Sequence, residues 1–548
     1  MPNVFHPNAG TIFNTYAPPA DGLVLPSSAL PKPSDDIPAA ATPSAGIEVY
    51  SFEFEGVTLL PVAEVEAQLA PLIGQRVTLE DLRQAAARVT SLYRRHGYFL
   101  ARAYVPAQKI NGGGVHIAVL EGRYDAVEAS GSARLDDARV DKTLLAQGVA
   151  PGEPIEQKSL ERSLILLEQW VGAPTSAVLQ PGSSIGTSTL RIDAPSGRLF
   201  SGSLGADSLG NRYTGEERTV ASMQLNSPAG IGDAGDLWAA YSSGARALFT
   251  SYQAPVGHRG LTFGASYADF HYELCCEFTV LDRAGDATVA GVQARYPLLL
   301  SQRSLLNAGI GLQRKRLTDT WAQGDLADRS VRATTITLDG LSAARFGQVR
   351  YQLALTGGDL QINGPADFIA INAATIDTAG RYDKLWAQAE VFHPLRGGGA
   401  VNFRLSGQMA SRNLDSSEKL VLGGYNGVRA YPEGEAAGDE ALLARVEWVT
   451  PLRFSAMPGK AALRVFVDGG TVWIVDDTRD GSADPGITNH YSLGGAGLGF
   501  NWNLPNRLSL SAYVATKIGN NPGRSANGND ADGEDSDSRG WLSMVWAF

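Results

Sequence analysis

The chain has 548 residues, of which 19% are charged, fewer than the ~25% of typical soluble proteins. Its net charge of −11 and the lack of a basic block argue against a nucleic-acid partner. No run of ~18 apolar residues occurs, which excludes a transmembrane helix but leaves open a membrane β-barrel, whose apolar signal is diluted by alternation.

The first 46 residues are rich in proline and alanine and predict an extended N-terminal linker. Proline-containing segments at 18–20 and 31–33 disfavour both helix and strand pairing. The first ten residues contain neither a charged stretch nor an apolar one, so no signal peptide is visible.

Residues 47–122 predict a small α+β domain. A strand at 47–54 precedes a short helix at 62–72 and a longer helix that Thr78 caps and Gly97 ends. Two strands follow, at 99–106 and 114–121, and the second alternates apolar and polar residues.

Residues 123–194 repeat that order in pattern, and they therefore predict a second domain of the same kind. A strand begins near Val127, helices are expected at 142–147 and 157–171, and strands at 176–180 and 187–192.

Residues 195–548 alternate apolar and polar side chains in segments of about ten residues, with Gly, Asn, Asp and Pro between them. Sixteen such strands can be placed, and an even number suits a closed barrel that leaves no unpaired edge in lipid. The fold class is therefore mostly β: a 16-stranded antiparallel transmembrane barrel preceded by two small α+β domains.

The connections between the strands alternate in length, as in a barrel with short periplasmic turns and long outer loops. Short connections are expected at 256–260 and 396–399, and long ones at 317–326, 363–380, 413–439, 476–489 and 519–538. In the last strand Leu542, Met544, Trp546 and Phe548 share one side. Bacterial outer-membrane barrels commonly end on such an aromatic residue, so Trp546 and Phe548 are the predicted assembly signal.

Enzyme signatures are weak, and we expect no catalysis, cofactor or metal site. Residues 182–186 match G-x-S-x-G, but a strand follows where a nucleophile elbow needs a helix. The acidic residues at 530–537 miss the spacing of a calcium loop and predict a solvated outer loop. The adjacent Cys275 and Cys276 could form a vicinal disulfide, although an exposed loop without a role is the favoured interpretation.

Two stretches resemble the motifs of a known family. One contains the run Gly427, Val428, Arg429, Ala430 and Tyr431, and the other contains Phe466, Asp468 and Gly470. They resemble the V-R-G-Y/F and F-x-D-x-G motifs of two-partner secretion transporters, the TpsB proteins, which export haemolysins, filamentous adhesins and related exoproteins. Ala430 stands where the family has Gly. Weaker similarities occur at 211–215, 252–257 and 296–298.

The resemblance spans residues 47–548 and implies an architecture. POTRA-like domains at 47–122 and 123–194 would lie in the periplasm, and the barrel at 195–548 in the outer membrane. The loop at 413–439 would fold back into the lumen and place Arg429 against an acid of the inner wall, for which Asp468 is the expected partner. The contact would either fasten the loop or take part in the transport cycle.

The resemblance also implies a function, namely an outer-membrane transporter that captures an unfolded exoprotein and secretes it through its barrel without ATP. The implied partners are a TpsA-like, β-helical exoprotein, outer-membrane lipid and the barrel-assembly machinery, and a monomer is expected. A barrel-assembly factor, a passive porin or uptake channel, and a secreted β-rich adhesin stay as alternatives. Assembly factors usually have more than two POTRA-like units, and a porin does not need such a periplasmic module.

Overall fold

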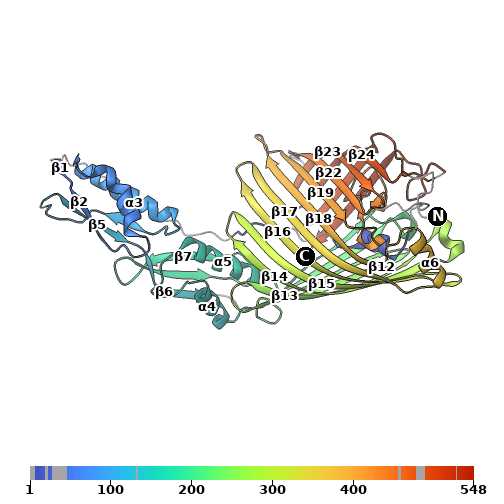
Figure 1. Ribbon diagram of the computed structural model, residues 1–548, viewed down its shortest axis with the longest axis horizontal. Coiled ribbons are helices and arrows are strands. Elements are labelled where there is room, and N and C mark those ends of the chain that lie inside the picture. Colours follow the sequence, from blue (N-terminus) through green and yellow to red (C-terminus); the bar gives the residue numbers. More distant parts are fainter. Residues whose placement is uncertain are drawn as a thin grey trace.

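Two small α+β units lead into a large barrel in the computed structural model of the chain (Figure 1). The structure describes residues 7–18, 23–27, 46–110, 112–130, 134–453, 458–476, 488–525 and 527–548. The proline-containing segment at 31–33 and most of 18–20 lie outside these residues. Among the residues described, no helix is long and apolar enough to cross a membrane.

The first unit packs two helices on a three-stranded sheet with the order β2-β5-β4, in which β2 and β5 are parallel. Thr78 caps α3 as expected, through a capping box with Asp81. The elements are β1 (Ile47–Glu48), β2 (Ser51–Glu55), α2 (Val62–Leu69), η1 (Ala70–Leu72), β3 (Arg76–Val77), α3 (Leu79–Arg95), β4 (Arg102–Tyr104) and β5 (Gly114–Leu120).

The second unit repeats this arrangement, with the sheet order β6-β8-β7. The expected helix at 142–147 is longer than predicted and begins at Asp137, because the Asp136 side chain caps its first turn. Residues 182–186 form the turn between β7 and β8. The elements are β6 (Arg123–Ser130), α4 (Asp137–Ala146), α5 (Gln157–Val171), β7 (Ser176–Pro181) and β8 (Thr187–Asp193).

Sixteen antiparallel strands form the closed barrel, which confirms the predicted fold class. The last strand, β26, pairs with the first, β9, and closes the wall. The strands are β9 (Phe200–Asp207), β10 (Arg218–Asn226), β11 (Ala234–Ser242), β12 (Ala245–Val256), β13 (Leu261–Glu273), β14 (Ala284–Leu300), β15 (Ser304–Trp321), β16 (Gly324–Ala344), β17 (Gly347–Ile362), β18 (Gly380–Pro394), β19 (Ala400–Ala410), β22 (Glu440–Leu452), β23 (Lys460–Trp473), β24 (His490–Asn503), β25 (Leu508–Lys517) and β26.

Strand β26 (Ser538–Ala547) shows the alternation that was expected of a lipid-facing strand. Leu542, Met544 and Trp546 are exposed on its outer side, whereas Trp541 is buried. After β26, the Phe548 N–H donates to the Gly202 carbonyl of β9 at 3.0 Å. The ring of Phe548 lies where a side chain at Gly202 would collide with it. The C-terminal residue therefore packs on the seam between the first and last strands.

The predicted long connection at 317–326 is wrong, because β15 and β16 continue through most of it and turn at residues 322–323. Asp319 lies within this segment, on strand β15. Asp319 is only 4% exposed and pairs with Arg329 of β16. A charged lumen-facing position is still compatible with strand alternation, because the inside of such a barrel is polar.

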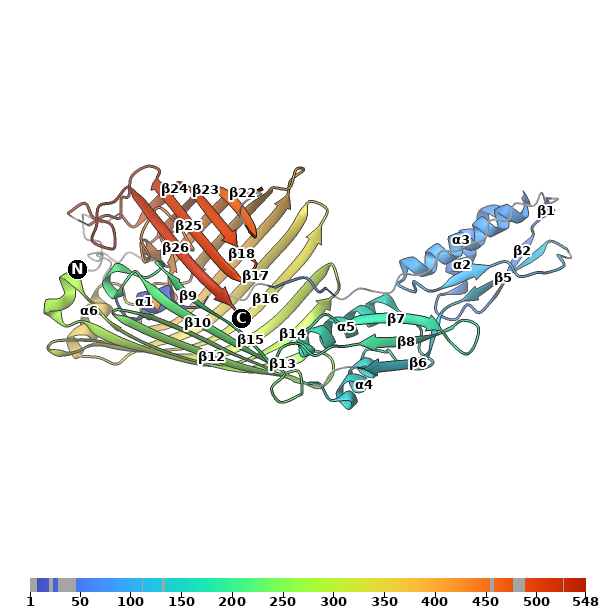
Figure 2. The same cartoon turned by 180° about the vertical axis from the view of Figure 1, so that it is seen from behind.

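The expectation of a wholly extended N-terminal linker is also wrong, because residues 9–16 form the helix α1 (Ala9–Tyr16). Asn8 caps it in a capping box with Thr11. Ile12, Phe13 and Tyr16 are buried in one cluster with side chains of the barrel wall, so the helix lies inside the barrel (Figures 1 and 2). Tertiary packing, rather than composition, makes this short segment helical.

The second unit contacts the short turns at one end of the barrel (Figure 2). Arg139 of α4 donates to the Pro255 carbonyl at 3.0 Å, and Arg162 of α5 donates to the Pro297 carbonyl at 3.0 Å. Leu300 of β14 is buried within the core of this unit. The segments 252–257 and 296–298, which carry two of the weaker family similarities, therefore contact the second unit.

The longer loops between the barrel strands contain the remaining short elements. Thr214, within the third similarity at 211–215, lies 3.3 Å from the Tyr16 hydroxyl of α1. Cys275 and Cys276 form a vicinal disulfide between β13 and β14. These elements are η2 (Arg212–Thr214), η3 (Cys276–Leu281), α6 (Ala366–Ala374), η4 (Ser416–Glu418), β20 (Leu420–Val421) and β21 (Ala437–Gly438).

The expected solvated acidic loop at 530–537 is wrong in part, because two of its carboxylates are buried. Asp530 is 3% exposed and pairs with Lys517 at 2.5 Å, and Asp532 is 1% exposed and pairs with Arg539. Basic partners from the neighbouring strands neutralise these carboxylates, which allows burial. Among the residues described, no group of three His, Cys, Asp or Glu side chains is placed to hold a metal ion.

Candidate functional site in the barrel lumen

The loop between β19 and β22 enters the barrel and returns on itself. Its two arms pair as the short ladder of β20 and β21, and the Leu422 N–H donates to the Ala436 carbonyl at 3.1 Å. At its tip the chain turns so tightly that a Cβ on Gly427 would lie 1.9 Å from the Leu422 carbonyl oxygen. Only glycine fits there, which explains one residue of the motif.

Arg429 at the tip is 2% exposed and forms a two-pronged contact with Asp468 of β23. Its Nε donates to Asp468 Oδ2 at 2.8 Å, and its Nη2 donates to Asp468 Oδ1 at 2.9 Å. The Arg429 backbone N–H donates to the same carboxylate at 3.2 Å. Such bidentate, charge-assisted pairs are strong and geometrically specific.

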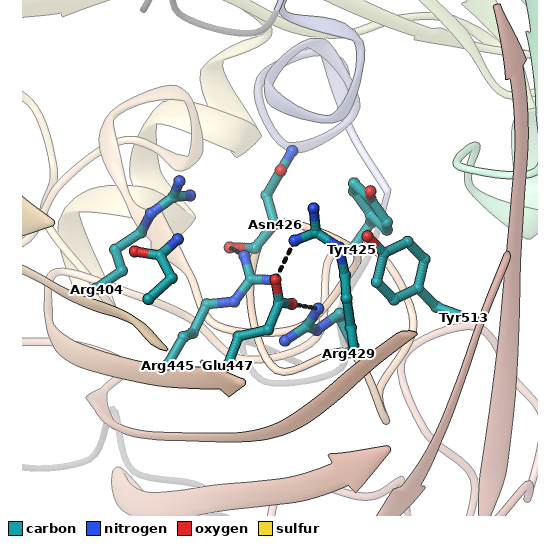
Figure 3. A pocket seen from close by; sticks show the side chains of 9 residues that line it. Arg404, Tyr425, Asn426, Arg429, Arg445, Glu447 and Tyr513 are labelled. Atoms are coloured by element: carbon teal, nitrogen blue, oxygen red, sulfur yellow. Dashed lines mark hydrogen bonds and ion pairs between the residues drawn. The ribbon is translucent and has the colours of Figure 1, made fainter. Parts of the chain in front are cut away.

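A second acid, Glu447 of β22, completes the site. Arg429 Nη1 donates to Glu447 Oε2 at 2.8 Å, while Arg464 holds the other oxygen of Glu447 (Figure 3). Glu447 was not predicted from the sequence. Its signal was available, because Val446 and Trp448 on either side face lipid and a charged residue between them has to face the lumen.

Aromatic side chains enclose Arg429 and position it. The guanidinium carbon lies 3.4 Å from the centroid of the Phe466 ring, a cation–π contact. The indole N–H of Trp541 donates to the Arg429 carbonyl at 2.8 Å. The face of the Phe466 ring thus contacts the guanidinium group from inside the barrel. The neighbouring Val465 and Val467 are exposed on the outer side of the same strand.

The other motif residues pack the tip against the wall. Val428, Ala430 and Tyr431 are buried in one cluster with Phe466. Ala430 does not have a positive φ, and its Cβ faces Gly495, where a second Cβ would lie only 2.6 Å away. Alanine in place of the family glycine is therefore accommodated by the missing side chain of Gly495. Gly470 similarly allows Leu422 to approach, since a Cβ there would lie 3.0 Å from that side chain.

The base of the loop is fastened by further buried ion pairs, which sequence reasoning missed. Arg329 Nη1 donates to Asp415 at 2.8 Å, and both side chains are almost completely buried. Lys315 and Lys384 each lie 2.7 Å from a Glu418 oxygen. These partners are far apart in the sequence, and no local motif marks them.

Helix α1 and the loop base share this network. The Ala9 N–H at the start of α1 donates to Asp319 at 2.8 Å, and Asp319 also pairs with Arg329. The Ser416 hydroxyl donates to the Asn8 side chain at 2.7 Å. Gly10 allows this approach, because a Cβ there would lie 2.4 Å from the Ser416 oxygen. The two segments that occupy the lumen are therefore held together at one end.

A cavity of about 200 Å³ opens beside the loop tip (Figure 3). It is lined by Asn402, Arg404, Tyr425, Asn426, Arg429, Arg445, Glu447, Arg464 and Tyr513. The predicted assembly residues Trp546 and Phe548 lie apart from this site. Their ring centroids are 5.4 Å apart, beside the seam between the first and last strands.

Comparisons with known proteins show which family the chain resembles. Residues 186–502 match the family model of the haemolysin secretion/activation protein ShlB/FhaC/HecB, and residues 47–122 match a POTRA domain of the ShlB type. The heme/hemopexin transporter protein HuxB of Haemophilus influenzae (strain 86-028NP) is 25% identical over 488 residues, which cover 87% of this chain and 82% of HuxB.

Two further similarities concern CdiB proteins. The outer membrane transporter CdiB of Dickeya dadantii (strain 3937) is 24% identical over 444 residues, covering 77% of this chain and 75% of that protein. The solved structure of CdiB from Escherichia coli superimposes with a TM-score of 0.76 and 20% identity, over 95% of this chain and 94% of that one. The family model covers more than half of the chain, and the chain therefore belongs to the ShlB/FhaC/HecB family of outer-membrane secretion proteins.

Proposed function

We propose that this member of the family captures an unfolded exoprotein in the periplasm and secretes it through its barrel, with loop 413–439 as the part that controls the lumen. The observation that carries the proposal is the buried Arg429, which a bidentate contact with Asp468 holds inside the barrel. A passive pore does not require an inserted loop whose tip arginine is buried and paired with two carboxylates.

Capture would begin at the two small units, 47–122 and 123–194, which we propose to be POTRA domains. Each contains a three-stranded sheet with two edge strands, β2 and β4 in the first and β6 and β7 in the second. An extended chain can add to such an edge through main-chain hydrogen bonds. The docking of the second unit on the turns of β12 and β14 would deliver the captured chain to the mouth of the barrel.

Passage would require the lumen to open, because α1 and loop 413–439 both pack against the inner wall. We propose that Arg429 fastens the loop in a defined resting position and re-forms its contact with Asp468 after each transport cycle. Folding of the exported chain outside the cell would supply the free energy, since a folded partner cannot slide back.

We further propose that the partner is a TpsA-like, β-helical exoprotein and that the transporter works as a monomer. The barrel-assembly machinery would insert it after recognising Trp546 and Phe548. These rings lie at the closing seam, where assembly of the barrel has to end.

The experiment first looks for a large β-helical exoprotein encoded beside this chain, and then measures its secretion in a strain that lacks the chain and in one that regains it. We expect the exoprotein outside the cell only when the chain is present. Retention of the exoprotein in the periplasm, despite a barrel that migrates as folded in unheated gels, would contradict the proposal.

Topology gives a second test. In a background with Cys275 and Cys276 replaced by Ser, single cysteines are introduced at Asn527 in the last long loop and at Lys158 in α5, both exposed positions. An impermeant thiol reagent should label Asn527→Cys on intact cells and Lys158→Cys only after the outer membrane is disrupted. The reverse pattern would refute the orientation.

A further inference from the structure

A row of charged side chains crosses five neighbouring strands on the lumenal side of the wall. Strand register pairs Arg350 with Glu390, Glu390 with Arg404, Arg404 with Arg445, and Arg445 with Asp468. The signs alternate except at one step, where Arg404 lies directly opposite Arg445. Like charges at directly opposite positions destabilise a sheet, so this step needs a compensating anion.

The acids within the row do not supply enough acceptors for these two arginines. The Glu390 carboxylate accepts from Arg404 at 3.1 Å, but also from Asn402 at 2.7 Å and from Arg350 at 3.4 Å. A guanidinium group has five N–H donors, and among the described residues of the wall only the Glu390 carboxylate accepts from Arg404.

Arg445 is in a similar position. Its Nε lies 3.4 Å from Asp468 Oδ1, and both oxygens of that carboxylate already accept shorter bonds from Arg429. Its Nη1 donates to the Asn426 carbonyl at 3.0 Å. Arg445 therefore shares an acid that another arginine holds more tightly.

The spare donors face one enclosed space. The cavity beside the loop tip is lined by four arginines, Arg404, Arg429, Arg445 and Arg464, and by one carboxylate, that of Glu447 (Figure 3). Arg429 and Arg464 already hold Glu447. A partly enclosed site with excess positive charge attracts an anion strongly, because the low local dielectric weakens screening.

We propose that this cavity is a binding site for carboxylate side chains of the chain that is being exported, an inference that rests on the proposed function. The planar guanidinium groups of Arg404 and Arg445 on adjacent strands suit the two oxygens of a carboxylate. A volume of about 200 Å³ admits a single acidic side chain. A carboxylate bound there also lies beside Arg429, so it competes with Asp468 and Glu447 for the arginines that hold the loop.

The test measures binding to the purified full-length protein in detergent, with a fluorescent peptide rich in glutamate as the probe. The same peptide with every Glu replaced by Gln is the neutral control, and inorganic phosphate is added as a competitor. We expect the glutamate peptide to bind and its glutamine counterpart not to bind. Arg404→Gln should weaken binding about tenfold, as expected for the loss of a charge-assisted hydrogen bond.

Arg404 is the preferred position because it does not contact Arg429, so the loop contact stays intact in the variant. Arg404→Lys keeps the positive charge but loses the planar guanidinium that can donate two parallel hydrogen bonds, and it should weaken binding less than Arg404→Gln. Arg246→Gln removes an exposed arginine from the outer face of β12 and should bind the peptide as the native protein does. Resistance of the unheated barrel to unfolding in gels shows that each variant is folded.

Equal binding of both peptides, or unchanged binding in the folded Arg404→Gln and Arg404→Lys variants, would overturn the inference. Binding of phosphate without displacement of the peptide would also overturn it, because the site would then take a free anion instead of the exported chain. Secretion is measured on the same variants. Failure of the native protein to secrete would count against the proposed function, whereas unchanged peptide binding in a secreting Arg404→Gln variant counts only against this site.

Discussion

Two segments occupy the lumen, and different interactions dominate in holding them: apolar packing for one and buried ion pairs for the other. Helix α1 presents Ile12, Phe13 and Tyr16 to the wall and packs mainly by burying apolar surface. The tip of loop 413–439 depends on one buried arginine that two carboxylates and an aromatic ring surround. Apolar packing is non-directional and tolerates small shifts, whereas a buried ion pair loses most of its stabilisation once one partner moves. The loop tip is therefore placed by one ion pair, whereas α1 combines apolar packing with directional hydrogen bonds at its start, such as that from the Ala9 N–H to Asp319.

The largest effect is expected from breaking the contact at the loop tip. Arg429→Ala leaves Asp468 buried without its main partner, and removal of one member of such a pair costs about 3–5 kcal/mol. Secretion should fall below a tenth of the native level, while the barrel still inserts, because its lipid-facing strands are unchanged. Arg429→Lys should also be poor, since an ammonium group cannot form the two-pronged contact.

The matched control for this change is Arg316→Ala. Arg316 pairs with Asp328 at 3.1 Å, but its side chain is 63% exposed, and such exposed pairs contribute only ~0–1 kcal/mol. Secretion by this variant should stay near the native level. Equal losses for the two variants would show that any arginine of the barrel matters as much as Arg429.

The next effect comes from the point where the two segments meet. Arg329→Met should leave Asp319 and Asp415 buried without their shared cation, which loosens both the start of α1 and the loop base. We expect a leaky pore with higher ion conductance in planar bilayers and a smaller loss of secretion than for Arg429→Ala. A native conductance in this variant would show that apolar packing alone keeps α1 in place.

The sequence allowed prediction of the loop tip but not of α1 or the loop base, and the reason is physical. Arg429 and Asp468 were paired through the resemblance of two short runs to family motifs, and close approach at Gly427 and Gly470 explains the glycines in those runs. Helix α1 is stable only against the wall, and its eight residues lie beside proline-rich segments that suggest a linker. Arg329 and Asp415 meet across 86 residues of sequence, a distance at which a single sequence carries no signal.

A smaller effect is expected at the closing seam. Deletion of Phe548 removes a ring that packs beside Gly202 and Trp546, together with a backbone hydrogen bond to β9. The amount of folded barrel in the outer membrane should fall, while synthesis continues. Phe346→Ala removes an exposed aromatic residue from a turn and is the control. A native amount of folded barrel without Phe548 would remove the support for the assembly signal.

The smallest effect concerns the first small unit, far from the lumen. Burial raises the pKa of the Glu121 carboxyl, but hydrogen bonds from Thr58 and from the Leu59 N–H outweigh this effect and hold the pKa below its usual value. Because the folded pKa is depressed, the stabilisation is fully present at neutral pH and is lost as the pH falls through the lowered pKa.

After correction for the intrinsic pH dependence of exchange, the protection of the α3 and β5 amides should therefore fall on acidification in the native protein. In Glu121→Gln the corrected protection should change little between pH 7 and acid. Identical pH profiles for the two proteins would contradict the assigned role of the carboxylate, and secretion at neutral pH should change little in either case.

The central claim is that Arg429 and Asp468 act together to hold the loop tip for secretion, and the double-mutant cycle tests it most directly. Exoprotein secretion and ion conductance are measured for the native protein, Arg429→Ala, Asp468→Ala and the double variant. Because both changes remove one interaction, their effects should not add. The account predicts that the double variant secretes about as well as the worse single variant. Strictly additive losses would show that the two residues act independently and would contradict the account.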